Sequence, residues 1–249
     1  MIRLDRGTLV APVTWKAKVD KRFPDAAIFW REAAAFEKLD LVVRKATKFK
    51  SHAKHTLPPP DHEFPAVWRS SKALKKALCA MSDGHCAYCQ ASVDDAGHGA
   101  VEHFRPKSLF PMLAYEWDNY FYSCERCNTF KSDKWPDRGE YVRPDAGDPA
   151  VRFIFTGLGR VKAVARDRDA RITIRDLDLN RSPLASKRRT AIRASLRGLR
   201  AMLKLPGVAA ADLHKYAKTQ IVGRLTRYSE AINQNVRRVW GQAFPGLKI

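Results

Sequence analysis

The chain has 249 residues, of which 45% are hydrophobic and 29% are charged. This length allows one large domain or two small ones, and the apolar fraction argues against an intrinsically disordered chain. The unusual property is the charge, because 46 lysine and arginine residues against 26 acidic residues give a net charge of +20. Such an excess points to nucleic acid as a partner, although a basic surface that serves only solubility would have the same composition.

The sequence contains no predicted membrane or targeting segment. Its apolar runs fall short of the roughly 20 residues that a membrane helix needs. The first residues, MIRLDRGTLVAPV, carry several charges and lack the apolar core of a signal peptide. We therefore expect a soluble, cytoplasmic protein without a membrane partner.

The basic charge is concentrated at the two ends of the chain. Residues 1–78 have a net charge of +9 and residues 181–249 one of +13, whereas residues 79–140 have a net charge of −4. The net negative charge of residues 79–140 indicates that carboxylate side chains have a functional role in this region. We predict three regions: a basic helical N-terminal region (1–80), a cysteine-rich centre (81–140), and a small β segment followed by a basic helical C-terminal region (141–249).

Two helices are predicted in the N-terminal region. The first begins at Pro24-Asp25, and its apolar face is formed by Phe29, Phe36, Leu39 and Val43. It ends before the stiff break at Pro58-Pro59-Pro60. The second runs from Ser70 or Ser71 to about Met81, and its apolar face is formed by Leu74, Leu78 and Met81.

Four of the five cysteines form two pairs in the central region. These are Cys86-x-x-Cys89 and Cys124-x-x-Cys127, with 34 residues between the pairs. Each tight turn points two sulfur atoms in one direction, so two turns can surround a tetrahedral Zn²⁺ with four thiolates. Such an ion has no open coordination position and would be structural. Buried free thiols are the alternative, and we expect Cys79 to be an ordinary core residue.

The rest of the central region is short, aromatic and rich in turns. We predict one strand over Val101–Phe104, a second over Tyr120–Ser123 and a helix that starts near Arg126. These elements form a ββα unit. Any catalysis has to come from this unit, because a zinc ion with four cysteine ligands does not catalyse.

Further strands and helices are predicted in the C-terminal region. Val151–Phe155 and Arg171–Ile174 have the pattern of strands. Ser182-Pro183 is a favourable start for a helix that Pro206-Gly207 ends. A last long helix is predicted over about 211–242, because its apolar residues recur at spacings of three and four.

The central region resembles the HNH nuclease family in its zinc-knuckle form. The matching segments are CAYC (86–89), EHFRPKS (102–108) and WDNYFYSCERCNTFK (117–131). The resemblance implies an α+β fold in which a zinc-stabilised ββα-metal finger is flanked by helical N- and C-terminal regions. It also implies a hydrolase that cleaves phosphodiester bonds.

The resemblance implies a role for several single residues. His103 matches the general base that takes a proton from the attacking water, and Asn119 matches the asparagine that anchors the loop and orients this histidine. Glu102 and Asn128 match the ligands of a catalytic Mg²⁺ or Mn²⁺ ion. Lys131 matches a lysine that lies near the phosphate.

The chemistry is consistent with these roles. Hydrolysis of a phosphodiester needs a base for water and a cation for the charge on the leaving 3′-oxygen, and carboxylate and amide oxygens suit Mg²⁺ or Mn²⁺. Glu102 and His103 can serve one site only if the strand twists or ends there, or if a backbone carbonyl takes part, because neighbouring strand residues point to opposite faces. Arg105 and Lys107 are predicted to contact nucleic acid, with solvated charge as the alternative.

A longer resemblance concerns one HNH subgroup. The segments VRPD (142–145), FIF (153–155) and TIRDLDLN (173–180), together with Arg188, are similar to the small HNH proteins encoded beside an ATPase in Septu-type and retron-linked antiphage systems. This implies an ABC/SMC-like ATPase partner. We therefore expect a DNA endonuclease; the alternatives are a nuclease that cleaves RNA such as tRNA, and a non-catalytic zinc module that binds nucleic acid or a partner protein.

Overall fold

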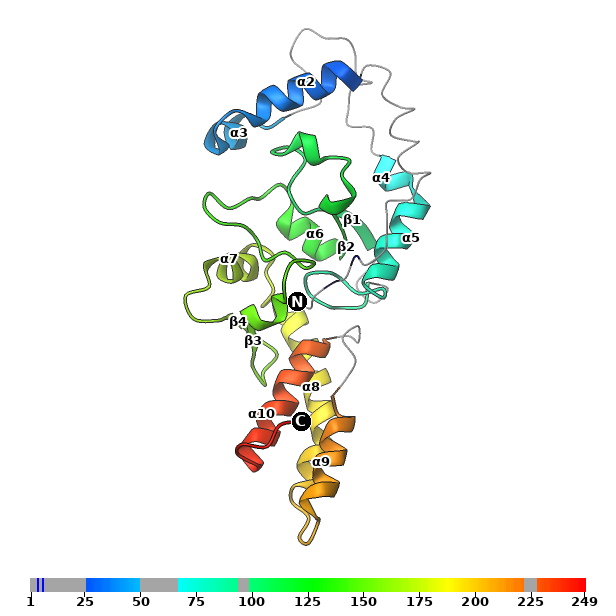
Figure 1. The fold of residues 1–249 in the computed structure, drawn as a ribbon, viewed down its shortest axis with the longest axis vertical. Helices are drawn as coiled ribbons and strands as arrows, with labels where there is room; N and C mark the ends of the chain where they lie inside the picture. Colours follow the sequence, from blue (N-terminus) through cyan, green and yellow to red (C-terminus); the bar gives the residue numbers. More distant parts are fainter. Residues whose placement is uncertain (1–3, 5, 7–25, 50–66, 94–98, 222–227) are drawn as a thin grey trace. The chain divides into compact units, whose positions relative to one another are not determined.

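The structure is a computed structural model that describes residues 4, 6, 26–49, 67–93, 99–221 and 228–249 (Figure 1). The chain packs as two compact units. The N-terminal unit consists of Asp5–Cys86 and Val93–Glu140, and the C-terminal unit consists of Met1–Leu4, Ala87–Ser92 and Tyr141–Ile249. The three regions predicted from composition divide the chain differently and stay a prediction.

The first predicted helix is wrong in extent, because the structure has two helices there. The helix α2 covers Ala26–Glu37 and α3 covers Leu41–Thr47. The predicted helix is interrupted before Asp40. The Asp40 carboxylate accepts a hydrogen bond from the backbone N–H of Val42 at 2.8 Å and caps the start of α3. Pro24 and the proline break at 58–60 lie outside the described residues.

The second predicted helix is confirmed as α5, Lys72–Met81, which follows the short α4, Val67–Ser70. The hydroxyl of Ser71 accepts a hydrogen bond from the Leu74 backbone N–H at 3.2 Å and caps α5. The apolar face predicted from the spacing is buried, and it is formed by Leu74, Leu78 and Met81.

Two strands and a helix follow in the predicted order. The strand β1, Gly99–His103, pairs antiparallel with β2, Tyr120–Cys124, and Glu102 lies opposite Phe121 in this pairing. The helix α6, Glu125–Lys131, packs against both strands, and α4 and α5 also contact β1. The connection between the strands contains two short 3₁₀ helices: η3 (Pro111–Leu113) and η4 (Trp117–Asn119).

In the C-terminal unit, a second small hairpin pairs β3, Phe153–Phe155, with β4, Val161–Ala163. The 3₁₀ helix η5, Pro149–Arg152, leads into β3, and α7 covers Arg168–Asp176. The strand predicted over 171–174 is therefore wrong, because this segment lies inside α7. Arg188 is buried here and donates a hydrogen bond to the Leu179 carbonyl at 2.6 Å.

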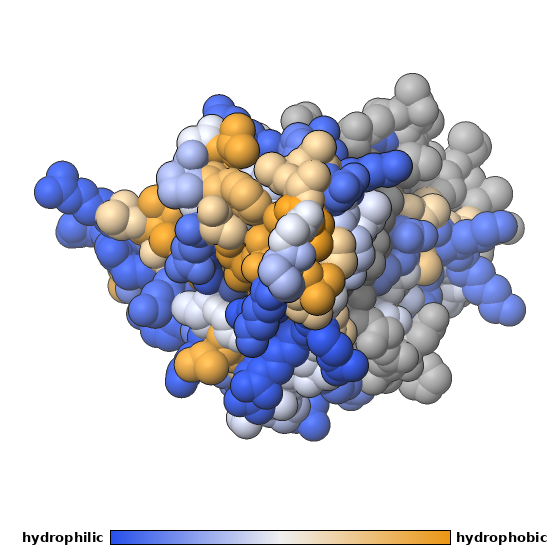
Figure 2. All heavy atoms as spheres, turned by 90° about the horizontal axis from the view of Figure 1, so that it is seen from below, coloured by the Kyte–Doolittle hydropathy of each residue, from blue (hydrophilic) through white to orange (hydrophobic). Residues whose placement is uncertain are grey.

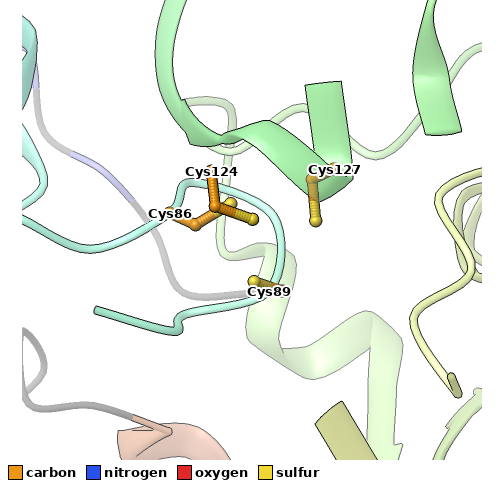
Figure 3. Close-up of side chains that lie close together, drawn as sticks. All are labelled: Cys86, Cys89, Cys124 and Cys127. Carbon is orange, nitrogen blue, oxygen red and sulfur yellow. The ribbon is translucent and has the colours of Figure 1, made fainter. Parts of the chain in front are cut away.

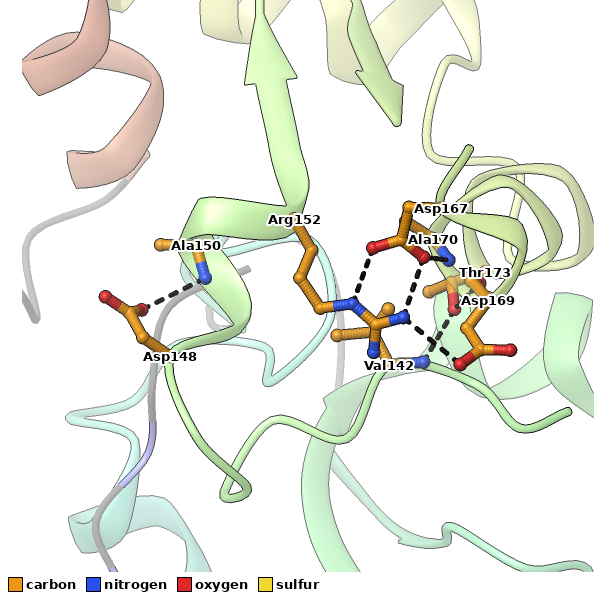
Figure 4. Close-up of polar contacts among 8 residues, drawn as sticks. All are labelled: Val142, Asp148, Ala150, Arg152, Asp167, Asp169, Ala170 and Thr173. Carbon is orange, nitrogen blue, oxygen red and sulfur yellow. Dashed lines mark hydrogen bonds and ion pairs between the residues drawn. The ribbon is translucent and has the colours of Figure 1, made fainter. Parts of the chain in front are cut away.

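A partly buried polar network holds the start of α7 (Figure 4). The carboxylate of Asp167 accepts a hydrogen bond from the Ala170 backbone N–H at 2.9 Å and caps α7. The guanidinium of Arg152 donates to the same carboxylate at 2.6 and 2.7 Å, and to Asp169 at 3.1 Å. Ala170 and Thr173 are fully buried, so the segment presents a helical face to the core.

Three longer helices complete the C-terminal unit: α8 (Ser182–Met202), α9 (Ala210–Thr219) and α10 (Ser229–Ala243). The single helix predicted over 211–242 is wrong, because it is two helices, and Tyr228 before α10 has a left-handed backbone with φ of 55°. On α8, Ile192, Leu196 and Leu199 are buried.

The outer surface of these helices is basic, with exposed side chains on α8 that include Lys187, Arg193, Arg197 and Arg200. Figure 2 shows apolar residues surrounded by hydrophilic ones on the face in view. Over the described part of the chain, no helix combines the length and the apolar character needed to cross a membrane.

Candidate functional site

The four paired cysteines lie together. Cys86 and Cys89 follow α5, Cys124 ends β2, and Cys127 lies in the first turns of α6. All four are buried, their sulfur atoms lie within 4.8 Å of one another, and the side chains converge (Figure 3). A tetrahedral zinc ion with Zn–S bonds of about 2.3 Å places its sulfur ligands about 3.8 Å apart. The cluster therefore fits a metal ion such as zinc.

The fifth cysteine is separate from this cluster. All five cysteines belong to the described part of the chain, and none of them forms a disulfide. Cys79 lies on α5, is partly exposed and is not one of the four clustered thiols. The spacing of the pairs, rather than the number of cysteines, thus predicted which thiols meet.

A cavity of about 760 Å³ opens beside β1 in the N-terminal unit. Four of the predicted site residues line it: Glu102, His103, Lys107 and Asn128. His103 is the last residue of β1, so the alternation of the strand ends there and two successive residues reach one cavity. Asn128 comes from α6, which packs against β1.

The imidazole of His103 is held in a nearly closed environment. It is 9% exposed, and the ring of Trp68 meets it edge-on with 4.7 Å between ring centroids. Its Nε2 lies 3.0 Å from the carbonyl oxygen of Ala114. A carbonyl oxygen only accepts hydrogen bonds, so Nε2 carries the proton and Nδ1 is left as the basic nitrogen.

Burial also sets the charge of this imidazole. It lowers the pKa of His103 from 6.5 to about 3, the hydrogen bond to Ala114 acts in the opposite direction, and the charges of Lys107 and Lys131 lower the pKa further. At neutral pH the ring is therefore uncharged.

Asn119 does not line the cavity, and its side chain forms hydrogen bonds that hold the loop after β1. Its side-chain oxygen accepts from the Arg105 backbone N–H at 2.8 Å, and its side-chain nitrogen donates to the carbonyl oxygens of Arg105 and Leu113 at 3.0 and 2.9 Å. Leu113 directly precedes Ala114, whose carbonyl holds His103. The contacts of Asn119 thus reach the histidine through the loop backbone.

Lys131 is fully buried and does not line the cavity. Its ammonium lies 2.5 Å from a carboxylate oxygen of Glu102 and donates a hydrogen bond to the His103 carbonyl at 2.7 Å. Burial raises the pKa of Glu102, and the charge and hydrogen bond of Lys131 offset part of this effect. Lys131 thus contacts Glu102 and His103 from the buried interior, whereas the resemblance implied a position near the phosphate.

The two predicted nucleic-acid contacts are placed differently from one another. Arg105 forms an ion pair with Glu140, and its guanidinium lies 5.5 Å from the centroid of the Phe110 ring. Lys107 lines the cavity, and its ammonium lies 5.8 Å from the centroid of the Trp68 ring. Only Lys107 of this pair is at the cavity.

Several cavity residues were missed from the sequence. Trp68, Arg69 and Lys75, from α4 and α5, also line the cavity. The pattern of α5 predicted its buried face, but it carried no information on which strand that face would meet. Trp68, Arg69 and Lys75 lie about 30 residues before His103 in the sequence, so a local pattern does not show that they meet this histidine at one cavity.

These features define an α+β protein with a candidate four-cysteine metal site and a cavity lined by a histidine, a carboxylate and an amide. No protein-family model matches the chain. The chain is similar to Septu protein PtuB of Bacillus thuringiensis, with 34% identity over 86 residues, which is 34% of this chain and 33% of that protein. It is also similar to Septu protein PtuB of Bacillus mycoides (strain KBAB4), with 26% identity over 166 residues, 55% of this chain and 56% of that protein. The matches thus span about one third and about half the length of these curated relatives.

Proposed function

We propose that this protein is a metal-dependent HNH endonuclease that hydrolyses phosphodiester bonds of DNA. The observation that carries the proposal is the cavity in which Glu102, His103 and Asn128 meet. A neutral imidazole beside two oxygen-bearing side chains provides a proton acceptor and ligands for a hard cation at one place. The net charge of +20 favours a polyanionic substrate.

His103 acts as the general base in this proposal. Its Nδ1 takes a proton from a water molecule, and the oxygen of that water attacks the phosphorus atom. The bond between phosphorus and the 3′-oxygen breaks, and the 3′-oxygen leaves as an alcohol after it gains a proton from solvent. Ala114 holds the imidazole from its other nitrogen at 3.0 Å, which keeps the basic nitrogen available.

Glu102 and Asn128 are the residues that would hold a catalytic Mg²⁺ or Mn²⁺ ion. Both residues line the same cavity, from β1 and α6, and both carry side-chain oxygen atoms, the ligand type that these hard ions prefer. When bound, such an ion stabilises the negative charge that develops on the leaving oxygen. The ammonium of Lys131, which does not line the cavity, lies 2.5 Å from a Glu102 carboxylate oxygen and restrains the position of this carboxylate.

The four-cysteine cluster is proposed to hold a structural zinc ion. Cys127 and Asn128 are neighbours in α6, and Cys124 precedes this helix. A zinc ion bound by these cysteines would fix the start of α6 and with it the position of Asn128. The zinc ion would be structural, because four thiolates leave no open coordination position on it, and the Mg²⁺ or Mn²⁺ ion would be catalytic.

The similarity to Septu protein PtuB supports a role in antiphage defence. We propose that the nuclease is the effector of such a system and acts with an ABC/SMC-like ATPase. The basic helices of the C-terminal unit offer a surface for DNA or for an acidic face of that partner.

The test is cleavage of nucleic acid by the full chain, alone and with the co-expressed ATPase and ATP. Supercoiled plasmid and transfer RNA are incubated in parallel with Mg²⁺, with Mn²⁺ or with EDTA. We expect plasmid cleavage that needs the divalent ion and falls at least about 100-fold in His103→Ala, the scale of a lost general base. Zinc content and circular dichroism of the variant serve as controls for its fold. Equal cleavage by both proteins, or cleavage of neither substrate with the partner present, would contradict the proposal, and cleavage of RNA alone would change its substrate.

A further inference from the structure

We propose that Arg69, Lys75 and Lys107 form a cationic wall of the cavity that binds the phosphate backbone of the nucleic-acid substrate. The inference rests on the proposed nuclease function and adds the residues that hold the substrate. Two members, Arg69 on α4 and Lys75 on α5, lie outside the segments that resemble the nuclease motif. The wall is thus supplied mainly by helices that precede the cysteine-rich centre.

The packing of α4 and α5 fixes this wall relative to His103. Trp68, next to Arg69, is 5% exposed and contacts both the His103 ring and the Tyr115 ring, with 4.7 and 5.6 Å between centroids. Lys75 follows Leu74, which is fully buried. Both helices pack against β1, the strand that ends at His103, so the two cations lie on secondary-structure elements beside the candidate site, where a side chain is positioned more precisely than on a loop.

The charges of the cavity leave these cations available for an anion. The two carboxylates of the lining already have partners, because Glu102 pairs with Lys131 and Asp133 pairs with Lys48. Among the described residues, no carboxylate lies within ion-pair distance of Arg69 or Lys75. Arg69 is exposed and Lys75 is partly exposed, so both can reach a ligand.

The ligand that fits is a phosphodiester chain. Each of its nucleotides carries one negative charge, and a guanidinium or an ammonium contacts phosphate oxygens without reading the bases. A cavity of about 760 Å³ that also contains the general base admits a segment of backbone with its phosphate near His103. We infer that the wall positions the strand and does not select its sequence.

The first test measures binding without cleavage, in the full-length His103→Ala protein. A fluorescent DNA duplex is titrated at several salt concentrations against this protein and against the same protein with Arg69→Ala and Lys75→Ala. We expect the added changes to weaken binding about tenfold and to lower the slope of log affinity against log salt by about 2, since each phosphate contact contributes about 0.9.

The matched control carries Lys72→Ala and Lys76→Ala in the same background. These lysines lie on the same helix, α5, are exposed, and do not line the cavity. The control removes the same charge, so we expect its affinity to stay within about threefold of the parent and its salt slope to fall by less than about 1. An equal loss in the control would overturn the inference, because it would assign the effect to general surface charge.

The second test measures cleavage by proteins that retain His103. Loss of Arg69 and Lys75 should raise KM about tenfold and change kcat less than about threefold, because the backbone contacts are made equally in the bound substrate and the transition state. If the wild type cleaves and the double variant keeps the wild-type affinity, salt slope and KM, the proposed role of the cationic wall is wrong and the nuclease proposal stands. If wild type neither binds nor cleaves nucleic acid, both proposals fall.

Discussion

The ammonium of Lys131 lies in a buried environment, whereas the sequence implied a position near the phosphate. It lies between the Glu102 carboxylate and the His103 carbonyl, and no part of its side chain is exposed. A buried charge pair is costly to break, because the remaining charge has neither water nor a partner. The structure thus makes Lys131 a positioning residue for its two neighbours at the cavity.

We predict that Lys131→Met lowers the free energy of unfolding by about 3–5 kcal/mol, the usual cost of leaving one partner of a buried pair. Lys134→Met is the matched control, because Lys134 is exposed and only three residues away. Urea unfolding at pH 7 measures the free energy of unfolding of both variants. Combining Lys131→Met with Glu102→Gln should recover part of the loss; a double variant with the summed loss of the two single changes would contradict the pairing.

The imidazole of His103 makes stability depend on pH. Its folded-state pKa of about 3 lies below its ordinary value of 6.5, so between these values the unfolded chain binds a proton that the folded chain does not. The contribution of the neutral ring is therefore fully present above about pH 6.5 and is lost on acidification, by about 1.4 kcal/mol per pH unit. Urea unfolding of wild type and His103→Gln between pH 7 and 4.5 checks this. Equal dependence on pH in the two proteins would show that the ring is not buried in its neutral form.

Elements whose pattern is local were predicted, and elements that depend on distant contacts were not. Helix α5 and the strands β1 and β2 follow from spacing and capping within their own segments. Residues 171–174, inside α7, have a strand pattern in the sequence, because Ile172 and Ile174 alternate with polar residues and are β-branched. The N-terminal cap of α7 is Asp167, whose carboxylate accepts from the Ala170 backbone N–H and from Arg152, 15 residues earlier. Such a contact cannot be read from periodicity.

We therefore predict that Asp167→Ala destabilises the C-terminal unit by about 1–3 kcal/mol, since it removes the cap of α7 and a bidentate partner of Arg152. Asp169→Ala is the matched control, because it removes one contact to the same guanidinium and leaves the cap in place. We expect it to cost less than about 1 kcal/mol. Thermal unfolding followed by circular dichroism ranks the two variants; a reversed order would assign the stability of α7 to Asp169.

At the scale of the whole molecule, the candidate site combines segments that the sequence separates. The motif predicted that Glu102, His103 and Asn128 belong together, and the structure places all three at one cavity. It did not predict the wall from α4 and α5, because an exposed cation on a helix has the same pattern whether it faces solvent or a cavity. The charge of +20 indicated a polyanionic partner but not where it binds.

The last prediction concerns the cysteine cluster, which joins two segments that 34 residues of sequence separate. A metal bound there cross-links the turn after α5 to the start of α6, and binding energy that exists only in the folded chain adds to its stability. We expect about one zinc per chain by elemental analysis. Cys86→Ser should lose the metal and unfold at a lower urea concentration, whereas Cys79→Ser, which alters a thiol outside the cluster, should keep both. Removing the metal with a strong chelator should affect the wild type and Cys79→Ser equally and leave Cys86→Ser unchanged. A stable fold without zinc in the wild type would instead make the four cysteines buried free thiols, and their convergence would then need another explanation.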